Sequence, residues 1–250
     1  MEKTMKTTST HLLKGLLLSA LLGSNVALAS VQVAGTRFVY PTAEREITVG
    51  LTNSGSQPAL VQTWLDKGDP ASTPGAQKLP FVIVPPLMRI EPGKGQTLRI
   101  AYIGGDVPKD RESVYWLNVL EVPPKSASAP GQNVMQIAFR SRLKLFLRPS
   151  DLPGSPEKAA EQVTWEVVHA AQGYVLRAHN KARYNISFSE VALNAGGQRY
   201  ANIDGGMVGP SGTFDFPLKG LSSNVASGEV DSRWISDYGN ANAQRYSLGQ

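Results

Sequence analysis

Short runs of apolar, β-branched and aromatic residues recur along the chain between turn-forming residues, and helical periodicity is nearly absent. This pattern is typical of an all-β sandwich. The first part of the chain is predicted to form strands at Val31–Tyr40, Glu46–Asn53, Leu60–Asp66, Phe81–Val84, Gln96–Ile103, Val114–Val122 and Val134–Leu147. Strands of this number and spacing match an immunoglobulin-like domain.

A break follows at residues 148–156, where Pro149, Pro153 and Pro156 each remove a donor that a strand ladder needs. Beyond it, Glu157–Gln162 is expected to form a helical turn or two. Weaker strand patterns then appear at Val163–Val168, Tyr174–Asn180, Ile186–Leu193, Thr213–Pro217 and Gln244–Leu248. The predicted fold is therefore all-β, with immunoglobulin-like sandwich domains over residues 30–149 and 157–250 and a linker over residues 150–156.

The first 29 residues have the features of a secretory signal peptide. Three lysines precede an apolar stretch at Leu16–Leu22, and Ala27-Leu28-Ala29 supplies the small residues of a cleavage site. A membrane anchor is the alternative, but the apolar stretch is too short to span a bilayer. We expect the mature chain to begin at Ser30 and not to insert into a membrane.

Composition excludes several kinds of function. The chain has no cysteine and three histidines, so thiol catalysis is impossible and a histidine-rich metal site is not expected. The signal peptide carries three lysines and one glutamate, so its removal lowers the net charge from +5 to +3. This excess is too small to indicate nucleic-acid binding.

Catalytic motifs are also missing from the sequence. His169 and His179 lie in strand-like segments, and the chain has no Gly-x-Ser-x-Gly elbow. The pairs Gly104-Gly105 and Gly196-Gly197 do not join a strand to a helix, as a phosphate loop would. We expect neither an enzyme nor a cofactor.

The predicted strand Val134–Leu147 is unusually long, and apolar residues alternate with cations along it. An exposed edge of this kind invites pairing with another chain, and natural proteins usually protect it. Residues two apart share a face of a strand, so Met135, Ile137 and Phe139 can fill successive pockets of a partner's groove. Packing against the protein's own core is the alternative; we prefer it for Leu145 and Leu147, and Leu143 is left open.

Several short motifs occur in a fixed order along the chain: Gly35–Pro41, Asn53, Pro58–Trp64, Pro80–Arg89, Leu98–Ile100, Asp110–Ser113, Trp116–Asn118 and Leu143–Pro149 in the first domain, and Asn180, Met207–Pro210 and Ile235–Gly239 in the second. In this order they resemble the PapD-like periplasmic chaperones of the chaperone–usher pathway. The family often has prolines just after the position of Asn180, whereas this chain has Lys181-Ala182-Arg183. The short loop Pro123–Gln132 and the missing cysteines resemble the short-loop subfamily, which assembles rod-like or thin fimbriae.

This resemblance implies two domains set in an L around a cleft, and a function in donor-strand complementation. In that mechanism the chaperone lends a strand, here residues 133–148, to a pilus subunit that lacks one. The residues implied in groove binding are Met135, Ile137, Phe139 and Leu143. Arg37 and Lys144 are implied in binding the subunit's C-terminal carboxylate, by charge-assisted hydrogen bonds.

The direction of Lys144 presents a difficulty. Lys144 has opposite parity to Ile137, so an unbroken strand would turn it to the other face. A bulge or strong twist would re-aim it, and Arg140 or Arg142 could serve instead.

Further residues match family positions with structural or docking roles. Glu112, Arg148 and Asp237 are implied in an ion-pair network between the domains. Pro58 and Leu60 match the usher-docking patch, with a packing role as the alternative.

The partners implied are pilus subunits and an outer-membrane usher, with a self-capping homodimer open for the idle protein. The location implied is the periplasm of a Gram-negative cell.

Two other functions remain as alternatives. A secreted two-domain β-sandwich adhesin or carbohydrate-binding protein should show clustered aromatic residues, whereas Trp64, Trp116, Trp165 and Trp234 are scattered. A secreted hydrolase lacks its catalytic residues.

Overall fold

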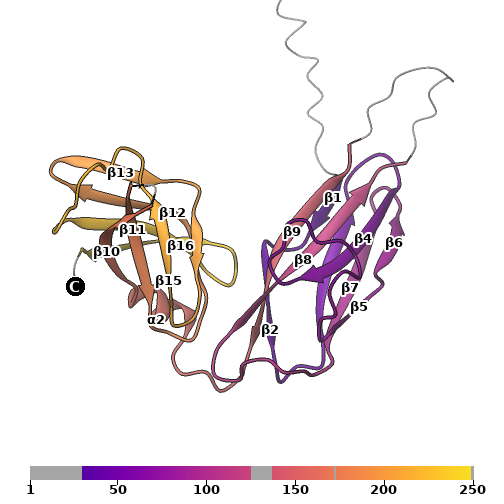
Figure 1. Cartoon of the computed structure of the whole chain (residues 1–250). Helices are drawn as coiled ribbons and strands as arrows, with labels where there is room; N and C mark the ends of the chain where they lie inside the picture. The colour runs from indigo at the N-terminus through magenta and orange to yellow at the C-terminus, as the bar shows by residue number, and fades with distance from the viewer. Residues whose placement is uncertain (1–29, 125–136, 172, 249–250) are drawn as a thin grey trace, which may run out of the picture.

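The computed structural model describes residues 30–124, 137–171 and 173–248 of the chain. Strands account for nearly all of its regular structure, and they form two β-sandwich domains set in an L (Figure 1). The predicted fold class is confirmed.

The first domain packs two sheets face to face. One sheet has the order β1-β3-β7-β5 and contains β1 (Val31–Val33), β3 (Ile47–Asn53), β7 (Gly95–Tyr102) and β5 (Phe81–Val84). The other has the order β2-β9-β8-β4-β6 and contains β2 (Arg37–Pro41), β9 (Phe139–Arg148), β8 (Ser113–Val122), β4 (Ala59–Asp66) and β6 (Leu87–Ile90). All neighbours are antiparallel except β2 and β9, which run parallel.

Two strand predictions in this domain were wrong in detail. The stretch Val31–Tyr40 is not one strand, because the chain leaves β1 at Gly35 with φ +139 and enters the opposite sheet as β2. Only glycine adopts that backbone angle readily. Strand β6 was missed because it has only four residues, between Pro86 and the turn that starts at Glu91.

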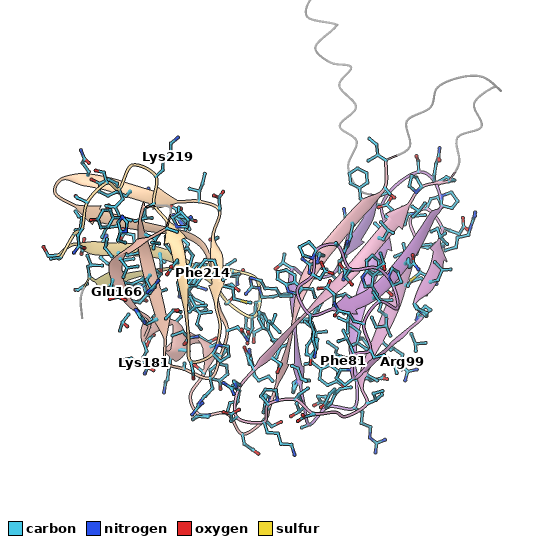
Figure 2. The ribbon with its side chains drawn as sticks, in the orientation of Figure 1. Phe81, Arg99, Glu166, Lys181, Phe214 and Lys219 are labelled. Carbon is cyan, nitrogen blue, oxygen red and sulfur yellow. The ribbon has the colours of Figure 1, made fainter. Side chains whose placement is uncertain are left out.

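The core of the first domain lies between the sheets and is rich in aromatic rings. Phe81 (labelled in Figure 2) contacts the rings of Tyr40, Tyr102 and Tyr115 with centroid distances of 4.8–6.0 Å. Tyr40 is fully buried, and its hydroxyl donates to the carbonyl oxygen of Arg45 (2.8 Å) and accepts from the N–H of Tyr102 (2.9 Å). Rings that satisfy their polar atoms in this way fix how the two sheets stack.

The second domain begins with α2 (Pro156–Glu161), which Ser155 caps by accepting a hydrogen bond from the N–H of Lys158. One sheet has the order β10-β11-β15, with β10 (Thr164–Ala170), β11 (Gly173–Asn180) and β15 (Gly212–Pro217). The other has the order β13-β12-β16-β17, with β13 (Gln198–Asn202), β12 (Ile186–Ala195), β16 (Glu229–Ile235) and β17 (Ala241–Ser247), and β14 (Gly206–Val208) also pairs with β12.

Strands β13, β14 and β16 were not predicted, because their sequences are polar, short or rich in glycine. Trp165, Phe188 and Phe216 form the centre of this domain's core.

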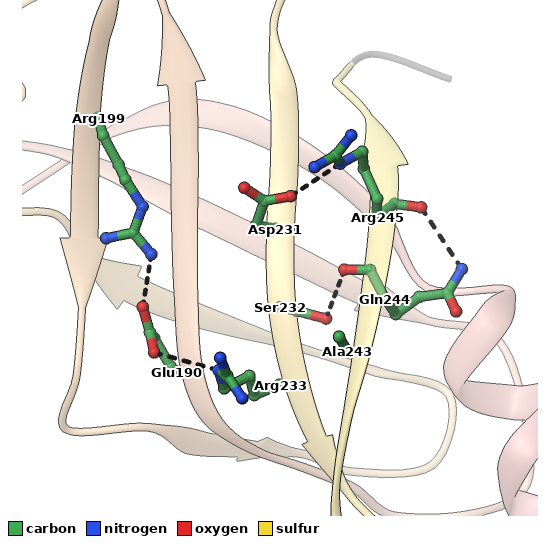
Figure 3. Close-up of a pocket in the computed structure, with 8 residues that line it drawn as sticks. All are labelled: Glu190, Arg199, Asp231, Ser232, Arg233, Ala243, Gln244 and Arg245. Atoms are coloured by element: carbon green, nitrogen blue, oxygen red, sulfur yellow. Dashed lines mark hydrogen bonds and ion pairs between the residues drawn. The ribbon is translucent and has the colours of Figure 1, made fainter.

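Charged side chains pair with each other on the outer face of the larger sheet in this domain (Figure 3). Glu190 on β12 bonds Arg199 at 2.5 Å and Arg233 at 3.6 Å, and Asp231 on β16 bonds Arg245 at 2.9 Å. Such exposed pairs contribute little to stability. Each of the three arginines already has a carboxylate partner on this face.

Candidate functional site

One edge of strand β9 is paired along the strand, whereas the other edge is paired over only about half of it. It pairs with β8 along its whole length, from Phe139 to Leu147, in unbroken register. Its other edge pairs with β2 only from Lys144 to Arg148. Within the residues that the structure describes, the backbone from Phe139 to Leu143 therefore has an open edge.

Apolar side chains accompany this edge. Ile137 is 47% exposed, and Ile137 and Phe139 line a hollow of about 290 Å³ together with Pro58. Met135 lies outside the described residues. Leu143 is half-buried and packs against the core of its own domain, as the fully buried Leu145 and Leu147 do. The structure thus shows Leu143 packed partly against its own core, and its implied role in groove binding stays a prediction.

The direction of Lys144 follows from the regular pleat of β9. Because the β8–β9 register is unbroken, Lys144 lies on the face opposite Phe139, and no bulge is needed. That face looks toward the second domain: the Lys144 ammonium donates to the hydroxyl of Ser187 on β12 (2.9 Å) and lies over the ring of Trp116. The long strand therefore presents apolar groups on one face and a cation on the other.

Arg37 and Lys144 lie side by side, because β2 and β9 pair them directly in parallel register. The Arg37 guanidinium donates to the carbonyl oxygen of Ile235 (3.0 Å), and its Nε is buried without a partner among the described residues. Neither side chain has a carboxylate within 4 Å in the described part of the chain. Two neighbouring half-buried cations thus have no direct counter-ion among the described residues.

The electrostatics of this pair reflect its burial. Burial, and secondly the positive charge of Arg37, lower the pKa of Lys144 to about 8. Burial also lowers the pKa of Arg37, against the attraction of Asp237. Both effects measure how unfavourable the charged forms are without an anion, so an added carboxylate would be strongly attracted.

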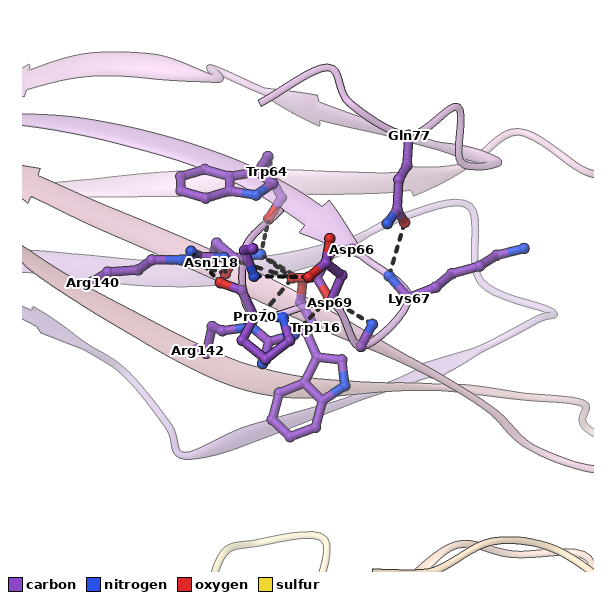
Figure 4. Close-up of polar contacts among 12 residues, drawn as sticks. Trp64, Asp66, Lys67, Asp69, Pro70, Gln77, Trp116, Asn118, Arg140 and Arg142 are labelled. Carbon is purple, nitrogen blue, oxygen red and sulfur yellow. Dashed lines mark hydrogen bonds and ion pairs between the residues drawn. The ribbon is translucent and has the colours of Figure 1, made fainter. Parts of the chain in front are cut away.

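Arg140 and Arg142 share the Lys144 face but are already engaged (Figure 4). Arg142 bonds the fully buried Asp66 at 2.6 Å and lies 4.5 Å from the ring centre of Trp116. Arg140 donates two hydrogen bonds to the side-chain oxygen of Asn118 and lies 4.7 Å from the ring centre of Trp64.

These contacts bind both guanidiniums to β4 and β8, whereas Lys144 reaches the second domain. Asp66 was not singled out from the sequence, and Trp64, Trp116 and Asn118 were named there as motif residues without these contacts. The available signal was the Arg-x-Arg spacing on one strand face.

Arg148 joins the two domains. Its guanidinium bonds Glu112 through Nε (2.5 Å) and Asp237 through its two terminal nitrogens (2.7 and 2.8 Å). Glu112 also accepts from the backbone and side-chain N–H groups of Asn185 in the second domain. Although burial alone would lower the pKa of Arg148, its hydrogen bonds to Asp237 and the charges of both carboxylates raise it.

Pro58 and Leu60 lie at the far end of the same sheet. Pro58 is half-buried, and Leu60 on β4 is 44% exposed. Leu60 belongs to the outward-facing set of β4, together with Gln62 and Trp64. Packing inside the domain is therefore not the role of Leu60.

The described residues hold no group of three or more His, Cys, Asp or Glu side chains that could bind a metal ion. None of the helices in the described ranges is long and apolar enough to cross a membrane.

Comparisons with known proteins agree with this geometry. Residues 30–153 match the family model of the pili and flagellar-assembly chaperone PapD N-terminal domain, and residues 158–246 match that of the pili assembly chaperone PapD C-terminal domain. The chain is 39% identical over 221 residues to the probable fimbrial chaperone YadV of Escherichia coli, covering 87% of this chain and 89% of the relative. It is 41% identical over 201 residues to the chaperone protein FimB/FhaD of Bordetella pertussis, covering 79% and 81%.

Solved structures give the same result. The crystal structure of the YadV chaperone superimposes with a TM-score of 0.76 at 37% identity, covering 88% of this chain and 100% of that one. A Salmonella enterica SafA pilin in complex with the SafB chaperone matches with a TM-score of 0.72 at 28% identity, covering 89% and 98%. The chain belongs to the PapD family of pilus-assembly chaperones.

Proposed function

We propose that this chaperone acts in the periplasm, where it binds, folds and caps pilus subunits by donor-strand complementation and delivers them to an outer-membrane usher. The observation that carries the proposal is the pair of half-buried cations, Arg37 and Lys144, beside an open strand edge. Burying charges without a counter-ion is unfavourable, so such a site favours an anionic ligand. The C-terminal carboxylate of a bound chain fits this site, because it is an anion that every polypeptide carries.

The edge of β9 supplies the other half of the binding. A guest strand laid along residues 137–143 would exchange backbone hydrogen bonds with it whatever the guest's sequence. Ile137 and Phe139 would then fill apolar pockets of the guest, each stabilising the complex by about 1.5–3 kcal/mol before entropy costs. From the alternation of the sequence, Met135 is proposed as a further groove-binding residue of the donor strand, residues 133–148.

The cation pair and the open edge of β9 together set the register of the guest strand. A carboxylate fixed by Arg37 and Lys144 sets where the guest chain ends, so the guest's register along β9 follows. The hub of Arg148 with Glu112 and Asp237 holds the second domain, including Ser187, at its place beside this anchor. A solved neighbour, the SafB chaperone in complex with the SafA pilin, supports a subunit as the partner.

An adhesin or carbohydrate-binding function is not favoured. Trp165 is in the core, while Trp64 and Trp116 are covered by the guanidiniums of Arg140 and Arg142. We propose a non-enzymatic role, with Pro58 and Leu60 as the usher-docking residues. The same open edge allows two idle copies to cap each other, which light scattering of the free protein would detect as a dimer.

Co-expression with a candidate subunit and pull-down from periplasmic extract tests the anchor. Arg37→Ala and Lys144→Ala should each lower recovery of the complex at least tenfold while the chaperone stays folded, because a desolvated charge contact costs about 2–5 kcal/mol when truncated. Lys94→Ala, at an exposed cation far from the site, is the matched control. Normal recovery with both anchor variants would contradict the proposal.

The edge is tested separately. Ile137→Asp and Phe139→Asp should leave the subunit aggregated or degraded, because a charge in an apolar pocket opposes docking. Val82→Asp on β5 is the control, since Val82 is 44% exposed and lies on the other sheet of the same domain. Equal effects of all three substitutions would remove the donor role of β9.

A further inference from the structure

A buried carboxylate that has no cation partner among the described residues lies at one end of the first domain. Glu121 on β8 is 6% exposed and shares its face with Leu117 and Val119, which belong to the core. No Lys, Arg or His side chain in the described residues lies within ion-pair distance of it. An isolated buried charge of this kind is strongly unfavourable, so a native structure normally supplies a partner.

In the described part of the chain, the hydrogen-bond donors to the Glu121 carboxylate all belong to Ser30 and Val31. Its carboxylate accepts hydrogen bonds from the backbone N–H groups of Ser30 (3.2 Å) and Val31 (2.9 Å) and from the hydroxyl of Ser30. Ser30 is the residue at which the sequence predicts the mature chain to begin. The nitrogen facing Glu121 is therefore the atom that signal-peptide removal would convert from an amide to an amine.

Ser30 occupies a built socket. Its carbonyl oxygen accepts from the N–H of Ser54 (2.8 Å), and β1 continues from it in register with Asn53. Gly55 closes the socket, because a Cβ at that position would lie 2.5 Å from the Cβ of Ser30. The neighbouring loop thus leaves room for this residue and holds its nitrogen against the carboxylate.

We propose that Glu121 is the binding site for the chain's own N-terminal ammonium, and that cleavage before Ser30 completes the first domain. Water hydrolyses the peptide bond between residues 29 and 30, leaving a carboxylate on the leader and an amine on Ser30 that takes up a proton at neutral pH. The ammonium then gives Glu121 its counter-ion and additional N–H donors. The proposal rests on the predicted cleavage site and is independent of how subunits bind.

The site has a consequence for the donor strand. Glu121 pairs directly with Phe139 in the β8–β9 ladder, and Ser30, Glu121, Ile137 and Phe139 line the same hollow. The ion pair therefore stabilises the part of β8 on which the open end of β9 rests. An uncleaved chain would have this region less stable than the mature protein.

A double-mutant cycle tests the ion pair. The mature protein is produced from a cleavable fusion to begin either at Ser30 or with Ala29 retained, each with Glu121 or with Glu121→Gln. The retained residue moves the ammonium one residue away, about 3.8 Å between Cα atoms, and leaves a neutral amide in the socket. With Glu121 it should raise the ratio of unfolded to folded protein, measured in urea, about tenfold, the size expected for a charge-assisted bond. With Glu121→Gln the same addition should change that ratio less than about twofold.

Two further measurements keep the test decisive. The mass of protein exported with its own leader should correspond to a chain beginning at Ser30; another start would overturn the proposal. If Glu121→Gln does not fold, the rate at which an amine-acylating reagent modifies the α-amine decides. That rate should be several-fold lower for the chain beginning at Ser30 than for the chain retaining Ala29. Equal rates, or equal losses of stability in both backgrounds of the cycle, would contradict the ion pair.

Discussion

Replacing Glu112 by glutamine should weaken the junction between the domains. The Glu112 side chain is 1% exposed, and its two oxygens accept from the Nε of Arg148 and from two N–H groups of Asn185. A glutamine keeps one oxygen and replaces the other by an NH₂ group, which then faces a donor on one side or the other. The substitution therefore removes a buried charge pair and sets donor against donor.

The magnitude follows from what Arg148 retains. Removing one member of a fully buried ion pair costs about 3–5 kcal/mol. Arg148 keeps both of its bonds to Asp237, and its side chain is 19% exposed, so solvent and the second carboxylate offset part of the loss. We expect the free energy of unfolding to fall by about 2 kcal/mol.

Urea unfolding followed by circular dichroism measures this change, and small-angle X-ray scattering reports whether the angle between the domains broadens. Glu46→Gln is the matched control: Glu46 also bonds an arginine, Arg99 (labelled in Figure 2), at 2.6 Å, but on the exposed surface. Screening by solvent makes a measurable loss there unexpected. Equal changes for both variants, or no change for Glu112→Gln, would refute the assignment of Arg148 as the interdomain hub.

Three other predictions follow from single groups. The pKa of Lys144 is about 8 in the folded protein, below its ordinary value of 10.5, so the unfolded chain binds more protons between these two pH values. The free energy of unfolding should therefore rise with pH between 8 and 10.5. Lys144→Met should remove this rise. Binding of a subunit carboxylate needs the charged form of Lys144. The affinity of the wild-type chaperone for the subunit should therefore fall above pH 8, whereas that of Lys144→Arg should not. A wild-type affinity that does not depend on pH would contradict the role of Lys144 in carboxylate binding. Asp66→Asn should lower the unfolding free energy by about 2–3 kcal/mol in urea melts, because Arg142 loses its buried carboxylate; an unchanged melt would show that Trp116 alone holds Arg142. Tyr40→Phe leaves the N–H of Tyr102 unpaired and should cost about 1–2 kcal/mol in the same assay, and a smaller loss would mean that this group finds another partner.

The strands that the sequence predicted well are those whose alternation is strong. β3, β4, β7 and β8 each have core-facing residues at every second position, so their bounds agree with the predictions to within a residue or so. The stretch Val31–Tyr40 shows the limit of this reasoning. Its core-facing residues are Val31 and Val33 before Gly35 but Phe38 and Tyr40 after it, and the three-dimensional pairing shows that the chain changes sheets there.

The direction of side chains in the site could be predicted only in part. The alternation along the strand predicted that Lys144 faces away from Ile137. The β8–β9 ladder of the described residues contains no bulge, so the regular pleat alone accounts for the direction of Lys144. Leu143 could not be assigned from parity, because it shares a face with both Phe139 and Leu145. Its packing depends on where β2 begins, which is a long-range property.

The central claim is that the open edge of β9 pairs with a subunit. Hydrogen–deuterium exchange of the backbone amides over residues 137–143, in the free chaperone and in the chaperone–subunit complex, tests it directly. We predict that exchange in this segment slows at least tenfold on loading while the amides of Gly173–Asn180 in β11 are unchanged. Unchanged exchange over residues 137–143 in a complex that contains the subunit would contradict the account.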